Sequence, residues 1–212
     1  MAIYLDEDMM GRDAATIGFP HLLVCMGLVL RTNNALWGVH LTDTEASRPV
    51  FAAFWAYATN KGLAAGHVTD MYSSCNFDIR YYASSAAARL EVWKGEVTSY
   101  ARVMNWQGNC RGFDTSVLAP ANGTYVEYQH QAHGAPSCRI FYKKDEKTTS
   151  TGAAVVNRNG GLADCVTWDH YTNAQKPASV MKTGINVTTP GGIRELDYAN
   201  RLRTFVIGPP PP

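Results

Sequence analysis

The sequence lacks a long hydrophobic run and a strong charge of one sign. Its longest apolar segment, His21–Leu30, is well short of the roughly 20 residues that a membrane-spanning helix needs. Nineteen Lys and Arg against 18 Asp and Glu give a formal net charge of +1, so no overall field attracts nucleic acid or an acidic membrane. We therefore expect no membrane span and no nucleic acid partner.

Cysteines are few, scattered and odd in number, which does not suit a disulfide framework. The five are Cys25, Cys75, Cys110, Cys138 and Cys165. Such a set is typical of reduced thiols in a cytoplasmic protein. The N-terminal stretch MAIYLDEDMMGRD is acidic, without the basic start and apolar run of a secretory signal. We expect a cytoplasmic protein, or one delivered to another cell by a route that needs no signal peptide.

Motifs for cofactors and metals are also scarce. The glycines of NRNGGL and TTPGG have neither Gly-Lys-Ser nor Gly-x-Gly-x-x-Gly spacing, so no nucleotide is expected. Asp169 and His170 are adjacent and would point to opposite faces of a strand, which argues against a dyad. Four zinc-type residues match no compact zinc pattern, and we interpret them as incidental: His130, His133, Cys138 and Cys165. We expect no cofactor and no metal.

The sequence does contain two Leu- and Val-rich segments around the turn-like RTNN. LLVCMGLVL and ALWGVHL predict a β-hairpin. The next segment predicts a helix from Pro49 to Lys61. Pro49 suits its first turn, Gly62 suits its end, and its apolar stripe comprises Val50, Phe51, Phe54 and Ala58. Further strands are predicted at GHVTDMY, NFDIRYY, EVTSYARVM, TYVEYQ, CRIFY, AAVV and RTFVIG, and a shorter helix at SSAAARLEVW. The predicted class is α+β: a strand-rich, sandwich-like single domain over residues 1–208 with an N-terminal hairpin followed by a long helix, and a Pro-rich tail at 209–212.

Side chains alternate across a strand, so each strand of the hairpin has two different faces. We expect one face to be buried against the helix, and it comprises Leu22, Val24, Met26, Leu28, Trp37, Val39 and Leu41. The other face carries Cys25 and His40, flanked by Gly27 and Gly38. Missing side chains at two glycines would let a substrate backbone or amide approach closely, so a shallow site is expected there.

The register of the hairpin decides how close Cys25 and His40 lie. A four-residue loop over residues 31–34 places them directly opposite each other, with β-carbons about 5 Å apart. A two-residue turn at Asn33 and Asn34, favoured by positive φ, pairs His40 with Gly27 and leaves Cys25 diagonal at about 7–8 Å. Both registers put the thiol and the imidazole on one face.

A cysteine beside a histidine can carry out acyl chemistry. A free thiol with a pKa of about 8.5 is mostly protonated at neutral pH, and a neighbouring imidazole can take its proton. The alternative is that Cys25 simply fills the core as a small apolar side chain, with His40 as a hydrogen-bonded residue of a binding or structural module.

The order of strand with cysteine, turn, strand ending in histidine, helix and strand resembles the papain-like glutamine deamidases. That group includes the chemotaxis-receptor deamidases and the catalytic domains of cytotoxic necrotizing factor toxins. The matching segments are LVCMGLVL, LWGVHLTD, the helix Pro49–Lys61 and GLAAGHVTDMY, which together cover about the first third of the chain. The family usually has Gly and Ser before its cysteine, where this chain has Leu23 and Val24.

The resemblance implies a hydrolase that deamidates glutamine side chains of a protein substrate through a thioester, as a bacterial effector or toxin would. Cys25 would be the nucleophile and His40 the base and then the acid. Backbone N–H groups of Cys25 or Met26 would bind the oxyanion. Thr16 and Thr42 are candidates for the group that orients the histidine. A cysteine peptidase with the same dyad, or a non-enzymatic module, are the alternatives.

Overall fold

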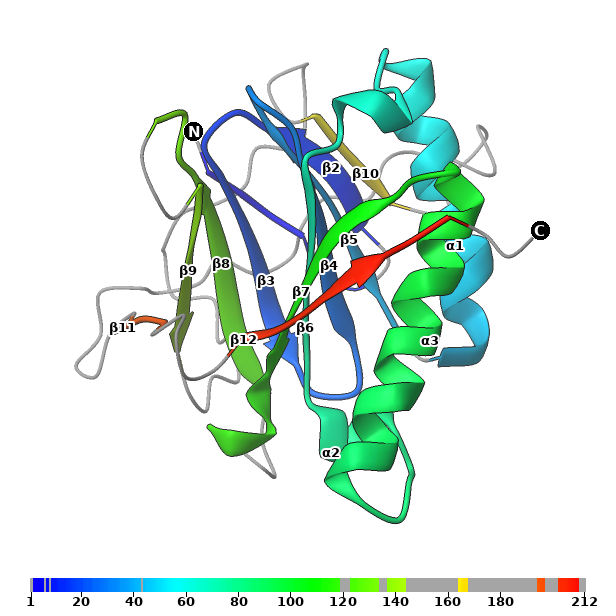
Figure 1. The fold of residues 1–212 in the computed structure, drawn as a ribbon. Coiled ribbons are helices and arrows are strands. Elements are labelled where there is room, and N and C mark those ends of the chain that lie inside the picture. The colour runs from blue at the N-terminus through cyan, green and yellow to red at the C-terminus, as the bar shows by residue number, and fades with distance from the viewer. Residues whose placement is uncertain are drawn as a thin grey trace.

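Figure 1 shows a computed structural model of the chain, which describes residues 2–5, 7, 9–42, 44–118, 123–133, 137–143, 164–167, 194–196 and 202–209. The fold is α+β, as the sequence predicts, with two sheets and two long helices in three layers (Figure 1). Of the other expected elements, AAVV lies outside the described residues, as do Asp169, His170 and residues 210–212 of the tail.

Two sheets form the first two layers of the described part of the chain. One has five strands in the order β1 (Ala2–Tyr4), β3 (Thr16–Leu22), β8 (Thr124–His130), β9 (Cys138–Lys143) and β11 (Arg194–Glu195). The other has seven strands in the order β10 (Asp164–Thr167), β2 (Met9–Asp13), β5 (Leu36–Leu41), β4 (Met26–Arg31), β6 (Asp70–Cys75), β7 (Gly108–Asp114) and β12 (Leu202–Ile207). We call them the five-stranded and the seven-stranded sheet.

The helices cover the face of the seven-stranded sheet that is turned away from the five-stranded sheet (Figure 1). They are α1 (Thr44–Asn60) and α3 (Ala86–Met104), with the short α2 (Phe77–Arg80), η1 (Ala65–His67) and η2 (Thr115–Val117) in the connections. The predicted helix from Pro49 to Lys61 is therefore confirmed, although it begins earlier, at Thr44. Gly62 follows it with a φ of +89°, a left-handed conformation that glycine adopts at little cost.

Two apolar cores lie on the two faces of the seven-stranded sheet. The core against the helices contains Met26, Leu28, Trp37, Val39 and Leu41, as the alternation predicts. The core between the sheets, which we call the intersheet core, contains residues of both sheets, among them Phe19, Cys25, Val29, Tyr72 and Tyr128. Packing on both faces explains why β4, β5 and β6 are buried along their whole length.

Two residues of the predicted helix-facing set lie elsewhere. Leu22 ends β3 and packs in the intersheet core, and Val24 is 40% exposed. The apolar run LLVCMGLVL was predicted to be one strand, but it belongs to two. The chain leaves the five-stranded sheet after Leu22, at the end of β3, and enters the seven-stranded sheet at Met26, where β4 begins.

Two predicted strands are helical. EVTSYARVM belongs to α3, where Val97, Tyr100, Ala101 and Met104 recur at helical spacing and are buried on one side. NFDIRYY contains α2, which begins after Asn76 because the Asn76 side chain accepts hydrogen bonds from the amides of Asp78 and Ile79. In both segments capping or periodicity outweighs the β propensity of the residues. Among the described helices, none combines the length and apolarity needed to cross a membrane.

Candidate functional site

The hairpin of β4 and β5 has the register expected for a two-residue turn. Gly27 pairs with His40 and Arg31 with Leu36, and the amide of Thr32 donates to the carbonyl of Ala35 at 2.9 Å. Asn33 and Asn34 form the turn without positive φ, so the reason for favouring it was wrong although the register was right. Extra bonds from the Thr32 hydroxyl to Ala35 stabilise the turn instead.

Cys25 lies immediately before β4, at the end of the strand remote from the turn. It belongs to the intersheet core and is 7% exposed. Its thiol donates to the carboxylate of Glu7, with 3.6 Å between Sγ and Oε1. Glu7 itself is an exposed residue between β1 and β2. The thiol is therefore close to a surface carboxylate, beside the half-exposed Leu23 and Val24.

His40 is fully buried on β5, on the same side of the seven-stranded sheet as Cys25. Its Nδ1 lies 2.8 Å from the carbonyl oxygen of Leu5. A carbonyl can only accept, so Nδ1 carries a proton, and in the neutral form of the ring Nε2 is the basic nitrogen. The edge of the ring meets Phe19, with the ring centroids 5.9 Å apart. These contacts fix both the tautomer and the orientation of the imidazole.

Two residues that are close in the chain, Leu5 and Glu7, contact the two candidate residues. The Leu5 carbonyl binds the imidazole of His40, and the Glu7 carboxylate binds the thiol of Cys25. Leu5 is held in place by its own amide, which donates to the carbonyl of Gly18 in the five-stranded sheet. The thiol and the imidazole therefore contact residues only two positions apart in the connection between β1 and β2.

The expectation that Gly27 and Gly38 open a shallow site is wrong. A β-carbon at Gly27 would lie 2.6 Å from the ring of Phe19, and one at Gly38 would lie 2.9 Å from Leu5. The missing side chains make room for the five-stranded sheet to pack closely. The exposed side chains next to Cys25 are those of Val24 and Glu7 at the strand end.

A buried ion pair supports that strand end. Arg80 of α2 and Glu96 of α3 form a bidentate pair, with Nε–Oε2 and Nη2–Oε1 distances of 3.1 and 2.6 Å. The remaining nitrogen, Nη1, donates to the carbonyls of Val24 and Thr42 at 2.8 and 2.5 Å. Val24 precedes Cys25 and Thr42 follows β5, so one guanidinium ties together the two chain segments that carry the thiol and the imidazole. We call Arg80 and Glu96 the buried ion pair.

The environment favours the charged form of both members of this pair. Burial alone would raise the pKa of Glu96, but hydrogen bonds and charge attraction from Arg80, together with bonds from Tyr100 and Tyr81, outweigh burial and hold that pKa below its usual value. Burial alone would lower the pKa of Arg80, but hydrogen bonds and charge attraction from Glu96 outweigh burial and raise that pKa above its usual value. The tyrosines donate to Glu96 at 2.5 Å each, so the carboxylate is saturated with donors.

The other described cysteines differ from Cys25. Cys75, Cys110 and Cys138 are free thiols with no exposed surface. Burial raises the pKa of Cys75 and Cys110 above the ordinary range and that of Cys138 to about 12. These three are therefore inert thiols at neutral pH.

The residues expected to orient the histidine make other contacts. The amide of Thr16 donates to Asp13 Oδ1 at 2.8 Å, and the carbonyl of Thr42 accepts from Arg80. The orienting acceptor that the structure shows is the Leu5 carbonyl. Within the described residues, no three metal-ligating side chains gather, and His130 instead bonds through Nε2 to the carbonyl of Thr32.

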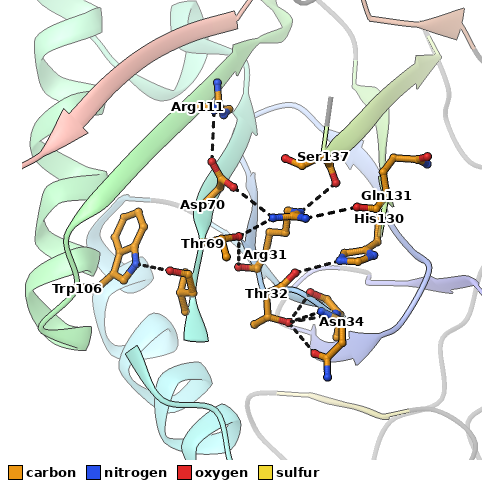
Figure 2. Close-up of polar contacts among 12 residues, drawn as sticks. Arg31, Thr32, Asn34, Thr69, Asp70, Trp106, Arg111, His130, Gln131 and Ser137 are labelled. Atoms are coloured by element: carbon orange, nitrogen blue, oxygen red, sulfur yellow. Dashed lines mark hydrogen bonds and ion pairs between the residues drawn. The ribbon is translucent and has the colours of Figure 1, made fainter. Parts of the chain in front are cut away.

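A second polar cluster lies at the other end of β4 (Figure 2). Arg31 reaches the carbonyls of Ser137 and Gln131 and the hydroxyl of Thr69, and lies 3.6 Å from Asp70. Asp70 in turn lies 3.4 Å from Arg111. Because Ser137 precedes β9 and Gln131 follows β8, Arg31 links the end of β4 in the seven-stranded sheet to strand ends of the five-stranded sheet.

Comparison with known proteins adds no identification. No protein family matches the chain, and no curated protein is similar to it. Sequence reasoning missed Glu7, Arg80 and Glu96, which lie far from the hairpin in the chain and carry no local motif. The one signal in the sequence that could have revealed Arg80 and Glu96 is a charged residue on the apolar side of each helix. That signal can be recognised only when the helix boundaries are known.

Proposed function

We propose that the chain is a cysteine-dependent amidohydrolase that deamidates a glutamine side chain of a protein. The observation that carries the proposal is that Cys25 contacts Glu7 while His40 contacts Leu5, two residues away, with Nδ1 of the imidazole held by a carbonyl so that Nε2 is the base. The order of strands and helix around Cys25 and His40 resembles that of the glutamine deamidases, and this supports the roles of nucleophile and base for the two residues.

In the proposed reaction, Nε2 of His40 takes the thiol proton and the sulfur of Cys25 attacks the carboxamide carbon. Backbone N–H groups of Cys25 or Met26 stabilise the oxyanion. The imidazolium returns its proton to the nitrogen, ammonia leaves, and a thioester remains. Water then attacks the thioester while His40 accepts its proton, which yields a carboxylate and restores the thiol.

The test is ammonia release from glutamine-containing proteins, with mass spectrometry to detect replacement of NH₂ by OH without chain cleavage. Cys25→Ser should abolish release, and Cys138→Ser, a change in the same core, should not. Fragments in place of a mass change would indicate the peptidase alternative. Deamidation that persists in Cys25→Ser would refute the proposal.

One observation favours a second candidate, a non-enzymatic binding module. Cys25 and His40 are 7% and 0% exposed and lie in an apolar core. In that case the protein would release no ammonia from glutamine-containing substrates, and the thiol of Cys25 would react with alkylating reagents only when the protein unfolds.

A further inference from the structure

A cavity of about 590 Å³ opens at the end of β4 that is remote from Cys25. It lies between β2, the turn at Asn33 and Asn34, and the loop that follows α1. Its volume falls in the range of about 300–1,000 Å³ that is typical of small-molecule sites. The proposed reaction makes no use of this cavity.

Basic side chains from three different elements line the cavity. Arg12 comes from β2, Lys61 follows α1 and His67 belongs to η1. The amide groups of Asn33 and Asn34 lie on the same rim, and the described lining includes no Asp or Glu. The described lining is therefore suited to a ligand that carries negative charge.

Aromatic rings beneath the cations hold two of them in position. The guanidinium carbon of Arg12 lies 5.3 Å from the ring centroid of Trp37, and Nζ of Lys61 lies 5.3 Å from that of Tyr57. Trp37 and Tyr57 are both buried and contact each other edge to face, with centroids 6.4 Å apart. The two cations thus rest on neighbouring rings of the core and lose less side-chain freedom on binding a ligand.

The hydrogen bond that His67 makes turns its other nitrogen into a donor. The amide of Ala64 donates to Nδ1 of His67 at 3.3 Å. Because Nδ1 accepts, the ring proton of the neutral form must be on Nε2. Nε2 therefore offers an N–H in both the neutral and the protonated state.

Backbone acceptors near the cavity already have donors. The last carbonyls of α1 are bound by the following amides, from Gly62 to Thr59 at 2.9 Å and from Leu63 to Ala58 at 3.0 Å. The carbonyl of Thr32 accepts from His130, and its hydroxyl bonds within the turn to Asn34 (Figure 2). The backbone acceptors that could bind a cation are therefore already occupied.

We propose that this cavity binds a small organic phosphate. A phosphate group has three strong acceptor oxygens and close to two negative charges, which matches several donors from separate elements better than a single carboxylate does. The cavity also exceeds the size of a bare anion, and the buried Trp37 beside it provides an apolar wall for the organic part.

The test is calorimetric titration of the full chain with phenyl phosphate at physiological salt. We expect saturable one-to-one binding, with phenol and benzoate bound at least tenfold more weakly. Lys61→Gln and His67→Gln should each weaken binding about tenfold, the loss expected for a charge-assisted hydrogen bond. Lys94→Gln is the matched control, because Lys94 is a lysine of α3 far along the chain from the cavity that pairs with Glu91. It should leave the affinity within about twofold of the original, because screening weakens distant charges.

Three results would overturn the proposal. One is the absence of saturable binding with a Kd below about 10 mM. The second is an equal loss in Lys61→Gln and Lys94→Gln, which would show attraction to overall charge only. The third is binding of benzoate as tight as that of phenyl phosphate, which would show that the cavity does not prefer phosphates to carboxylates. Both altered side chains near the cavity are exposed, and thermal melting of each variant confirms that the fold is intact.

Discussion

Glu96→Gln is the sharpest test of the buried ion pair that supports Cys25. The change keeps the size of the side chain but removes the charge that compensates Arg80, whose side chain has no exposed surface. Breaking a buried pair by removing one partner costs about 3–5 kcal/mol, a large part of the 5–15 kcal/mol by which a domain is stable. Urea unfolding at pH 7 measures the difference directly.

The matched control is Glu91→Gln on the same helix, because the Glu91 side chain, which pairs with Lys94, is 69% exposed. It should change the free energy of unfolding by no more than about 0.5 kcal/mol. Folding lowers the pKa of Glu96 from 4.5, so its contribution is complete above that value and is lost as the pH falls through the folded pKa. The gap between the original protein and Glu96→Gln should therefore narrow below pH 4.5. A loss under 1 kcal/mol at pH 7 would refute the reasoning.

Three further predictions follow from particular contacts. Gly38→Val should destabilise the protein by about 1–3 kcal/mol in urea unfolding, since a side chain there collides with Leu5 and Ile17; unchanged stability would contradict the packing. Glu7→Gln should speed alkylation of Cys25 at pH 7, because a carboxylate beside a thiol opposes the thiolate, and a slower rate would show that Glu7 activates it. Alkylation should not reach three buried thiols until the protein unfolds: Cys75, Cys110 and Cys138. Mass spectrometry of the alkylated native protein checks this, and rapid labelling of any of the three would disprove its burial.

Local periodicity accounts for the parts of the fold that the sequence predicted. Alternation in β5 and the spacing of Val50, Phe51, Phe54 and Ala58 in α1 each depend on a single apolar face, and both elements are confirmed. The register of the hairpin was one of two that two adjacent asparagines allowed. These features can be predicted from residues that are close together in the sequence.

Long-range packing explains the errors. Leu22 and Val24 continue an apolar run, but a change of sheet separates them from Met26, and only tertiary structure shows where that change falls. Gly27 and Gly38 suggested an opening because the sequence does not reveal which layer covers a strand. The contacts of Leu5 and Arg80 with the candidate site join residues 35 or more positions apart, beyond the reach of any local pattern.

The most direct test of the central claim is the rate of Cys25 alkylation by iodoacetamide between pH 6 and 7, in the original protein and in His40→Asn. An unperturbed thiol with a pKa of about 8.5 is only a few per cent ionised there. If Nε2 of His40 takes the thiol proton, Cys25 should react faster than a free cysteine and faster than every other described thiol, and His40→Asn should slow it at unchanged fold. If Cys25 reacts only on unfolding and at the same rate in both proteins, the cysteine serves packing and the enzymatic proposal is wrong.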